Sequence, residues 1–122
     1  MSKKIVIVDD NAAHNAVMLS LFQEAGYTDV CIAQTGTEGL EMIDAESPEL
    51  IILDTLLPDT TGFDVCKEVR EKRITPEPKI IIMTGFIDAV DVMKARQMGA
   101  DDYVVKTSDF SYLLDVVKKL IG

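Results

Sequence analysis

Three acidic residues follow two short apolar runs in this sequence. Asp54 ends the run Leu-Ile-Ile-Leu, and Asp9 and Asp10 come directly after the run Ile-Val-Ile-Val. Runs this short are typical of strands buried on both faces of a parallel sheet, and ligands bind where the carboxyl ends of such strands meet. We therefore expect the three carboxylates to share one site. Because like charges held together repel, a hard cation that prefers oxygen ligands, such as Mg²⁺, would be the natural ligand. Taken alone, Asp9-Asp10 is equally well a helix cap followed by a solvated acid.

Two further apolar runs supply a hydroxyl group and an ammonium group. Residues 79–83 lead into Thr84, and residues 103–105 lead into Lys106. A carboxylate such as Asp54 can act as a nucleophile toward a phosphoryl group. The transition state of that transfer spreads negative charge over oxygens that cations and hydroxyl groups stabilise. The sequence therefore predicts Asp54 as a phosphoacceptor, with Lys106 as a second cation and Thr84 as a hydroxyl donor. Taken singly, Lys106 is a surface lysine and Thr84 a strand end, so the combination carries the prediction.

A parallel sheet is needed to bring these side chains together. Short apolar runs alternate with segments of helical periodicity, which predicts an α/β fold with helices on both faces of the sheet and right-handed crossovers. We expect a flavodoxin-like (βα)5 three-layer sandwich with a parallel five-stranded sheet in the order 2-1-3-4-5, the order being taken by analogy. The predicted strands are residues 5–8, 29–33, 49–54, 79–83 and 103–105. The predicted helices end at residue 25, span residues 37–45, follow Gly62, span about residues 89–98, and close the chain from residue 110.

Two helices carry specific expectations about caps and buried faces. The first helix is expected to be capped by Asp10 or Asn11, and the last by Ser108 or Asp109. The residues of the first helix expected to face the core at helical spacing are Val17, Met18, Leu21, Phe22 and Ala25.

Composition limits the class of protein. The chain has 122 residues, which suits one domain spanning residues 1–122. Its net charge of −9 argues against direct binding to nucleic acid or to an anionic membrane. No apolar stretch approaches the ~18–20 residues of a membrane span, and the N-terminus becomes charged too soon for a signal peptide. We therefore expect a cytoplasmic protein.

Three residues with reactive side chains are expected to have no chemical role. Cys31 and Cys66 lack the spacing of metal ligands and are interpreted as free thiols in a reducing compartment. His14, near the start of the first helix, is either a phosphorylated histidine or metal ligand, or an exposed helix residue. The second interpretation is favoured because the sequence places no acid or base partner beside it.

Taken together, the motifs resemble those of a known family. The chain is similar, from residue 4 to residue 120, to the response regulator receiver domains of two-component signalling, of the single-domain chemotaxis-regulator type. Each motif alone is weak, but their order and intervals are highly specific. The segments that carry the resemblance are the acidic pair in residues 7–10, the phosphoacceptor motif in residues 54–58 with Gly62 eight residues after Asp54, the hydroxyl position in residues 83–85, and the last strand with its lysine in residues 99–106.

The resemblance implies a phosphorelay protein that turns over no separate substrate. Asp54 would accept a phosphoryl group from a phosphohistidine on a sensor histidine kinase or a histidine phosphotransfer protein. Mg²⁺ would be held by Asp10 and Asp54, by Asp9 mainly through water, and by the backbone carbonyl of Leu56. Such a domain promotes its own phosphorylation and dephosphorylation.

The resemblance also implies a conformational switch. Thr84 would move toward the phosphoryl group, and Tyr103 would turn inward behind it. The responding surface would be the fourth helix, the fifth strand and the fifth helix, and it would bind a downstream protein target. We expect a monomer or a weak homodimer, because solvation is the favoured role of the charged side chains on the last two helices.

Two positions near the expected site need separate expectations. Receivers usually place proline after the lysine, often through a cis bond, whereas Thr107 follows Lys106 here. A cis bond without proline costs about 2.5–4 kcal/mol. We therefore expect residues 106–109 to be trans or more mobile, with Lys106 held less firmly. The bulky Phe86 is expected to shield the site, with an effect of undetermined sign on the lifetime of the aspartyl phosphate.

Three alternative functions place different requirements on the sequence. A haloacid-dehalogenase-type phosphatase needs a second acid two residues after its nucleophile, where Leu56 stands. A flavodoxin-like electron carrier needs a hydroxyl- and glycine-rich phosphate loop after the first strand, where residues 9–11 stand. A degenerate receiver that acts as a phosphorylation-independent docking module stays open, although all five key residues are present.

Overall fold

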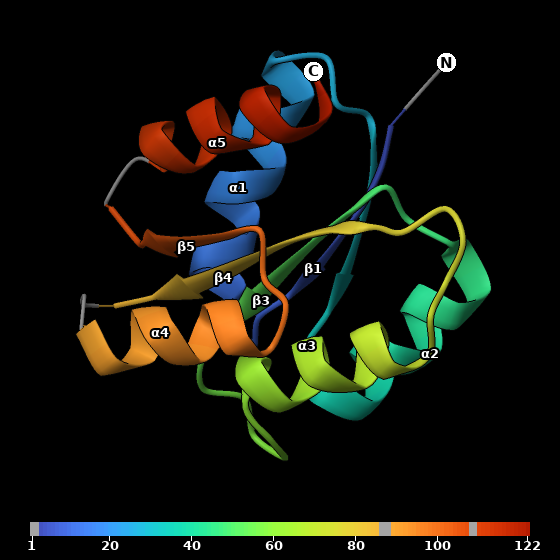
Figure 1. Ribbon diagram of the computed structural model, residues 1–122. Helices are drawn as coiled ribbons and strands as arrows, with labels where there is room; N and C mark the ends of the chain where they lie inside the picture. The colour runs from blue at the N-terminus through green and yellow to red at the C-terminus, as the bar shows by residue number, and fades with distance from the viewer. Residues whose placement is uncertain (1–2, 86–88, 108–109) are drawn as a thin grey trace.

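A computed structural model describes residues 3–85, 89–107 and 110–122 of the chain. Along these residues strands and helices alternate, and the strands form one parallel sheet in the order β2-β1-β3-β4-β5 (Figure 1). The predicted α/β fold and strand order are therefore confirmed. The elements are β1 (Lys4–Val8), α1 (Ala12–Glu24), β2 (Asp29–Ala33), α2 (Gly36–Glu46), β3 (Leu50–Asp54), α3 (Gly62–Glu71), β4 (Lys79–Thr84), α4 (Ala89–Gln97), β5 (Asp102–Val105) and α5 (Ser111–Ile121).

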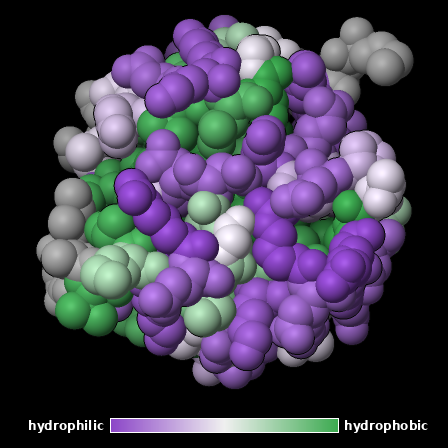
Figure 2. All heavy atoms as spheres, in the orientation of Figure 1, coloured by the Kyte–Doolittle hydropathy of each residue, from purple (hydrophilic) through white to green (hydrophobic). Residues whose placement is uncertain are grey.

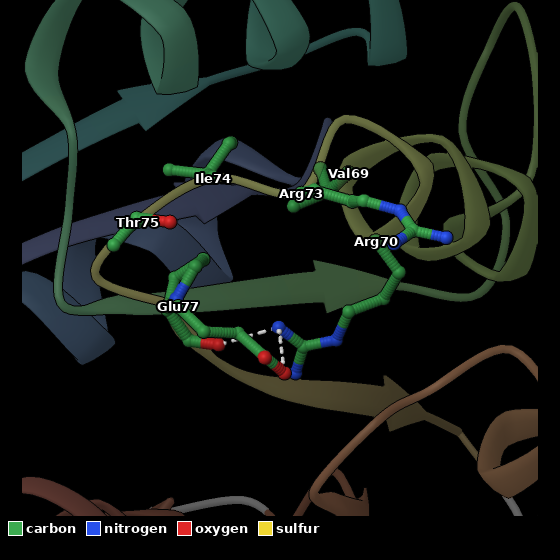
Figure 3. Close-up of a pocket in the computed structure, with 7 residues that line it drawn as sticks. Val69, Arg70, Arg73, Ile74, Thr75 and Glu77 are labelled. Carbon is green, nitrogen blue, oxygen red and sulfur yellow. Dashed lines mark hydrogen bonds and ion pairs between the residues drawn. The ribbon is translucent and has the colours of Figure 1, made fainter.

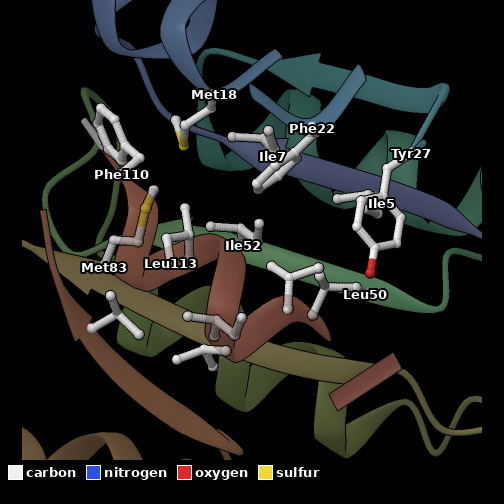
Figure 4. Close-up of a cluster of buried hydrophobic side chains, with 14 residues drawn as sticks. Ile5, Ile7, Met18, Phe22, Tyr27, Leu50, Ile52, Met83, Phe110 and Leu113 are labelled. Atoms are coloured by element: carbon white, nitrogen blue, oxygen red, sulfur yellow. The ribbon is translucent and has the colours of Figure 1, made fainter. Parts of the chain in front are cut away.

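The sheet separates two hydrophobic cores. Successive side chains of a strand point to opposite faces, so the central strands contribute alternate residues to each core and read as continuous apolar runs. One core joins the sheet to α1 and α5, and Figure 4 shows Met18 and Phe22 of α1 above strand residues such as Ile7 and Ile52. The other core joins the sheet to α2, α3 and α4. The strand residues of the α1/α5 core include Ile5, Ile7, Leu50, Ile52, Ile81, Met83 and Val104, and those of the opposite core include Val6, Val8, Ile51, Leu53, Ile80, Ile82 and Tyr103.

The predicted buried face of α1 is partly wrong. Asn11 caps the helix, as expected, and its side chain accepts a hydrogen bond from the His14 N–H. The buried positions are Asn15, Met18 and Phe22, whereas Val17 is 42% exposed. Ala25, the C-cap, is also exposed. The helix is rotated so that the Asn15 amide donates to the Asp9 carbonyl oxygen at 2.8 Å, a contact that apolar periodicity does not reveal.

The predicted cap of α5 is wrong. The helix begins at Ser111, and its N-cap residue is Phe110, which lies in the left-handed region at φ 56° and makes no capping hydrogen bond through its side chain. Ser108 and Asp109 lie outside the described residues, as does Phe86. Phe110 is only 2% exposed and belongs to the α1/α5 core. Burying such a side chain is worth about 1.5–3 kcal/mol, which exceeds the ~1 kcal/mol of a typical cap.

Both cysteines are free thiols, as the sequence predicts. Burial raises the pKa of the Cys66 thiol to about 11, which keeps it protonated and unreactive.

Polar side chains cover most of the face in view in Figure 2. Within the described ranges, every helix is too short or too polar to cross a membrane.

Arg70 of α3 joins three segments at the end of the sheet where β4 and β5 begin, opposite the end that carries Asp54. Its guanidinium donates to the carbonyl oxygens of Pro78, at 2.6 Å, and Gly99, at 2.8 Å. It also donates to a carboxylate oxygen of Asp101, at 3.0 Å, and this same oxygen accepts the Ile80 N–H. The Arg70 side chain is only 16% exposed. Charge-assisted bonds that are shielded from water in this way are among the stronger ones in a protein.

Arg70→Met should lower the free energy of unfolding by about 2 kcal/mol, because it leaves two carbonyls and a carboxylate without their shared donor. The measurement is urea unfolding followed by circular dichroism. Arg73→Met is the matched control, because Arg73 is exposed and its guanidinium lies apart from the Glu77 carboxylate (Figure 3). It should change stability by no more than about 0.5 kcal/mol. Equal urea midpoints for the two variants would contradict the role of Arg70.

Candidate functional site

Asp9, Asp54 and Lys106 follow strand residues that face the same side of the sheet. Ile7 and Ile52 are register partners in the α1/α5 core, and Asp9 and Asp54 each come two residues later. Val104 belongs to the same core, and Lys106 follows it by two residues. Because side chains alternate along a strand, the side chains of Asp9, Asp54 and Lys106 lie on this same face, at the carboxyl ends of the strands.

Lys106 forms an ion pair with each of the two acids. Its ammonium nitrogen lies 2.7 Å from Asp9 Oδ2 and 3.2 Å from Asp54 Oδ2. The three side chains are largely shielded from solvent, with exposed fractions of 11% for Lys106, 0% for Asp9 and 13% for Asp54. The backbone of Lys106 is fixed as well, because its N–H donates to the Thr84 carbonyl oxygen at 2.7 Å. Charges withdrawn from water in this way interact more strongly than surface charges.

The acidic cluster has the oxygen donors that suit Mg²⁺. Asp9, Asp10 and Asp54 each offer a carboxylate oxygen, and these oxygens lie within 4.8 Å of one another. Asp9 already accepts hydrogen bonds from the Asn11 N–H, at 2.9 Å, and from Lys106. Asp10 is exposed and can meet a hydrated cation. The three carboxylates and the one ammonium group carry a net charge of two negative units. A divalent cation that prefers hard oxygen ligands therefore fits the site.

Ionisation of Asp54 is disfavoured in the folded chain. Burial raises the pKa of the Asp54 carboxyl, and the neighbouring Asp9 carboxylate raises this pKa further, while Lys106 opposes both effects. The folded state therefore binds a proton at Asp54 more tightly than the unfolded chain does. The ionised carboxylate at neutral pH reduces the stability of the fold.

Thr84 and Tyr103 lie on the other phase of the sheet. Tyr103 is the register partner of Ile82, and both pack in the core shared with α2, α3 and α4. Thr84, which is 4% exposed, follows Ile82 by two residues. The Tyr103 ring stacks on Phe63 of α3 with centroids 6.5 Å apart, and its hydroxyl oxygen is buried. The side chain of Tyr103 therefore points inward.

The loop after β3 is held tightly against Asp54. The Thr55 N–H donates to Met83 O at 2.9 Å, and the Gly62 N–H donates to Thr55 O at 3.0 Å. A Cβ at position 62 would overlap the Asp54 carbonyl oxygen, which explains the glycine eight residues after Asp54. Leu56 is 75% exposed, and the role of its carbonyl as a metal ligand stays a prediction.

Asp59 ties this loop to the start of α2. Its carboxylate accepts the Gly36 N–H at 2.8 Å, the Thr37 N–H at 3.0 Å and the Thr37 hydroxyl at 2.8 Å. The bonds from the Gly36 and Thr37 backbone, followed by the Thr37 hydroxyl bond, lower the pKa of the Asp59 carboxyl to about 2. The Thr35 hydroxyl accepts the next backbone N–H of the helix, that of Glu38. The first-turn donors of α2 are thus satisfied, and its positive end holds a negative charge.

His14 is not the exposed residue that the sequence led us to expect. It is half-buried, and its Nδ1 lies 3.2 Å from the Lys106 ammonium nitrogen. Its ring also contacts the Phe110 ring edge-on, with centroids 5.6 Å apart. One signal was available in the sequence, because His14 lies four residues before Met18 on the side of α1 that faces the sheet.

The peptide bond after Lys106 is trans. Among the described residues, the only cis peptide bond joins Thr75 and Pro76. The trans alternative is therefore correct at Lys106–Thr107, while the rest of the expected loop, at positions 108 and 109, lies outside the described residues. The expectation that Lys106 is held less firmly stays a prediction, as do the roles of the site residues.

Comparison with known proteins identifies many relatives. A family model described as the response regulator receiver domain matches residues 5–118. The transcriptional regulatory protein AfsQ1 of Streptomyces coelicolor is 40% identical over 106 residues, which are 87% of this chain and 45% of that protein. The chain therefore spans less than half the length of this curated relative.

Solved structures share the whole fold. The chemotaxis protein CheY4 of Vibrio cholerae superposes with a TM-score of 0.91 at 26% identity, covering 99% of this chain and 100% of that one. The response regulator protein TrrA of Thermotoga maritima, solved in complex with Mg²⁺-BeF, gives a TM-score of 0.86 at 33% identity and covers 98% of this chain and 99% of that one.

Asp54→Asn should raise the midpoint of thermal unfolding by a few degrees at pH 7 without Mg²⁺, because it removes a carboxylate whose ionisation the fold disfavours. The exposed Glu41 of α2 gives the charge-matched control Glu41→Gln, which should leave the midpoint unchanged. Mg²⁺ at about ten times its dissociation constant should stabilise the wild type by about 1.4 kcal/mol and Asp54→Asn by less. A lower midpoint for Asp54→Asn without Mg²⁺ would refute this account.

Asp59→Ala should destabilise the protein in a pH-dependent manner. A carboxyl whose pKa is lowered from 3.8 to about 2 stabilises the fold above about pH 4, and this contribution is lost as the pH falls toward 2. The urea midpoint of the variant should therefore lie below that of the wild type at pH 7, and the difference should shrink between pH 4 and pH 2. Glu41→Ala, the control at an exposed carboxylate, should show no such convergence. A difference that is independent of pH would exclude the carboxylate as its cause.

Proposed function

This chain belongs to the response regulator receiver domain family, and we propose that Asp54 accepts a phosphoryl group from a phosphohistidine donor in a Mg²⁺-dependent reaction. The observation that carries the proposal is the contact of Lys106 with both Asp9 and Asp54 inside a cluster of three carboxylates. A nucleophilic carboxylate, a fixed cation and a set of metal ligands then lie within one site.

The proposed transfer is a simple displacement at phosphorus. A carboxylate oxygen of Asp54 attacks the phosphorus atom, so that a P–O bond forms as the P–N bond to the donor histidine breaks. The leaving imidazole takes up a proton from water. Lys106, already 3.2 Å from Asp54 Oδ2, would form an ion pair with a phosphoryl oxygen, and Thr84 would donate its hydroxyl to another.

The metal ligands of the proposal follow the family resemblance, and the role of Asp9 is supported by the contacts that it already makes. Asp10 and Asp54 would bind Mg²⁺ directly, together with the backbone carbonyl of Leu56. Asp9 would act mainly through water, because Asn11 and Lys106 already donate to its two oxygens. When bound, Mg²⁺ neutralises part of the charge that develops on the phosphoryl oxygens.

The output surface of the proposal is formed by α4, β5 and α5. Apolar side chains are exposed here, with Val90 at 71% and Met93 at 63% on α4 and Tyr112 at 55% on α5. Figure 2 shows apolar residues among hydrophilic ones on this side of the molecule. Thr84 and Tyr103 would act as the switch that changes this surface for a downstream protein target.

The setting of the proposed reaction is a two-component phosphorelay. The donor would be a sensor histidine kinase or a histidine phosphotransfer protein in the cytoplasm, with residues 1–122 acting as the receiver domain. We propose a monomer or a weak homodimer that promotes its own dephosphorylation and turns over no separate substrate. The activity of the whole protein is also a proposal, because AfsQ1 is more than twice as long as the matched region.

Incubation with acetyl phosphate and Mg²⁺ should add the mass of one phosphoryl group to the protein, as measured by intact mass spectrometry. Asp54→Asn should gain none, and EDTA should prevent the addition to the wild type, because the nucleophile or the metal is then missing. Circular dichroism of the variant controls for folding. An unmodified wild type that also ignores beryllofluoride with Mg²⁺ would favour the phosphorylation-independent docking module, whereas multiple turnover of a phosphate ester would favour a phosphatase.

A further inference from the structure

We propose that His14 is a positioning residue that holds Lys106 in the geometry needed for phosphoryl transfer. The inference rests on the proposed role of Asp54 as the phosphoacceptor. It assigns a function to a residue of α1 that lies outside the cluster of acids.

Three atoms able to accept a hydrogen bond lie close to the Lys106 ammonium nitrogen. These are Asp9 Oδ2 at 2.7 Å, Asp54 Oδ2 at 3.2 Å and His14 Nδ1 at 3.2 Å. An ammonium group has three donors and no acceptor, so each contact uses one hydrogen. The contact with His14 is the third of the ammonium group, and it fixes the orientation of that group.

The contact requires one tautomer of His14. Because the lysine can only donate, the contact is a hydrogen bond when His14 Nδ1 accepts, and the imidazole hydrogen then lies on Nε2. The edge-on contact with the buried Phe110 ring orients the imidazole. The backbone is also anchored, because the His14 N–H donates to the Asn11 cap at 3.0 Å. The acceptor is therefore held in place from two sides.

A neutral acceptor suits a lysine that must change partner. On phosphorylation Lys106 exchanges its contact with Asp54 for a phosphoryl oxygen, while Asp9 continues to attract it. A carboxylate at the third position would form a bond about twice as strong as a neutral acceptor does and would compete with the phosphoryl group. His14 instead restrains the ammonium group without adding negative charge.

Two variants separate the hydrogen bond from the packing of the ring. Asn Oδ1 stands in the same relation to its Cγ as His Nδ1, so His14→Asn keeps the acceptor, whereas His14→Leu removes it. Both variants lose the ring contact with Phe110. Phosphorylation by acetyl phosphate should be about three- to tenfold slower in His14→Leu, as expected for one lost hydrogen bond, and within about twofold of the wild-type rate in His14→Asn.

Equal slowing in the two variants, or a wild-type rate in His14→Leu, would overturn the proposal. If the wild type takes up no phosphoryl group, the proposed function fails instead. The tautomer of His14 then decides the present inference without any activity measurement. Nitrogen-15 NMR should find the Nε2–H tautomer in the wild type, and Lys106→Met should reduce its population. A hydrogen on Nδ1 of the wild-type residue would exclude the contact.

Discussion

The ion pair between Lys106 and the fully buried Asp9 is the constraint on which the site depends. An unpaired carboxylate at this depth would destabilise the fold by several kcal/mol, because a partner charge removed from a buried pair leaves the other without compensation. The two residues are 97 positions apart in the sequence, so the pair forms only when the sheet is complete. The same ammonium group reaches Asp54, and the folding of the sheet and the assembly of the site are therefore one event.

Much of the site was predictable because strand ends and side-chain alternation are local properties of the sequence. Asp9, Asp54 and Lys106 each follow a residue of the α1/α5 core by two positions, a phase that can be counted along the chain. Thr84 has the opposite phase, and this too can be counted. The register between strands was not predictable, because runs such as Ile-Val-Ile-Val pair equally well at several offsets. The strand order likewise came from analogy with a known layout.

The contacts that the sequence did not reveal join residues whose neighbours in the chain give no sign of the partner. Asp59 lies in the loop after β3, and only the folded chain shows that it binds the start of α2. Gly36 allows the loop to approach this closely, because a Cβ at position 36 would overlap Thr60. His14 has no charged neighbour in its helix, and its partner is supplied by the end of β5. At the start of α5, the preference for a polar capping residue was outweighed by burial of the Phe110 ring. Burial of the ring contributes more free energy than a typical cap does.

The two phases of the sheet define a path for the proposed signal. Asp54 and Lys106 continue the face covered by α1 and α5, whereas Thr84 and Tyr103 continue the face covered by α3 and α4. The central strands are buried on both sides, and a displacement inside such close-packed layers would open voids. A phosphoryl group on Asp54 would instead lie beyond the strand ends, where it can reach groups of both phases. In the proposed function the conformational change therefore passes from one face of the sheet to the other at the carboxyl ends of the strands. The inward Tyr103, stacked on Phe63 of α3, would carry that change to the output surface.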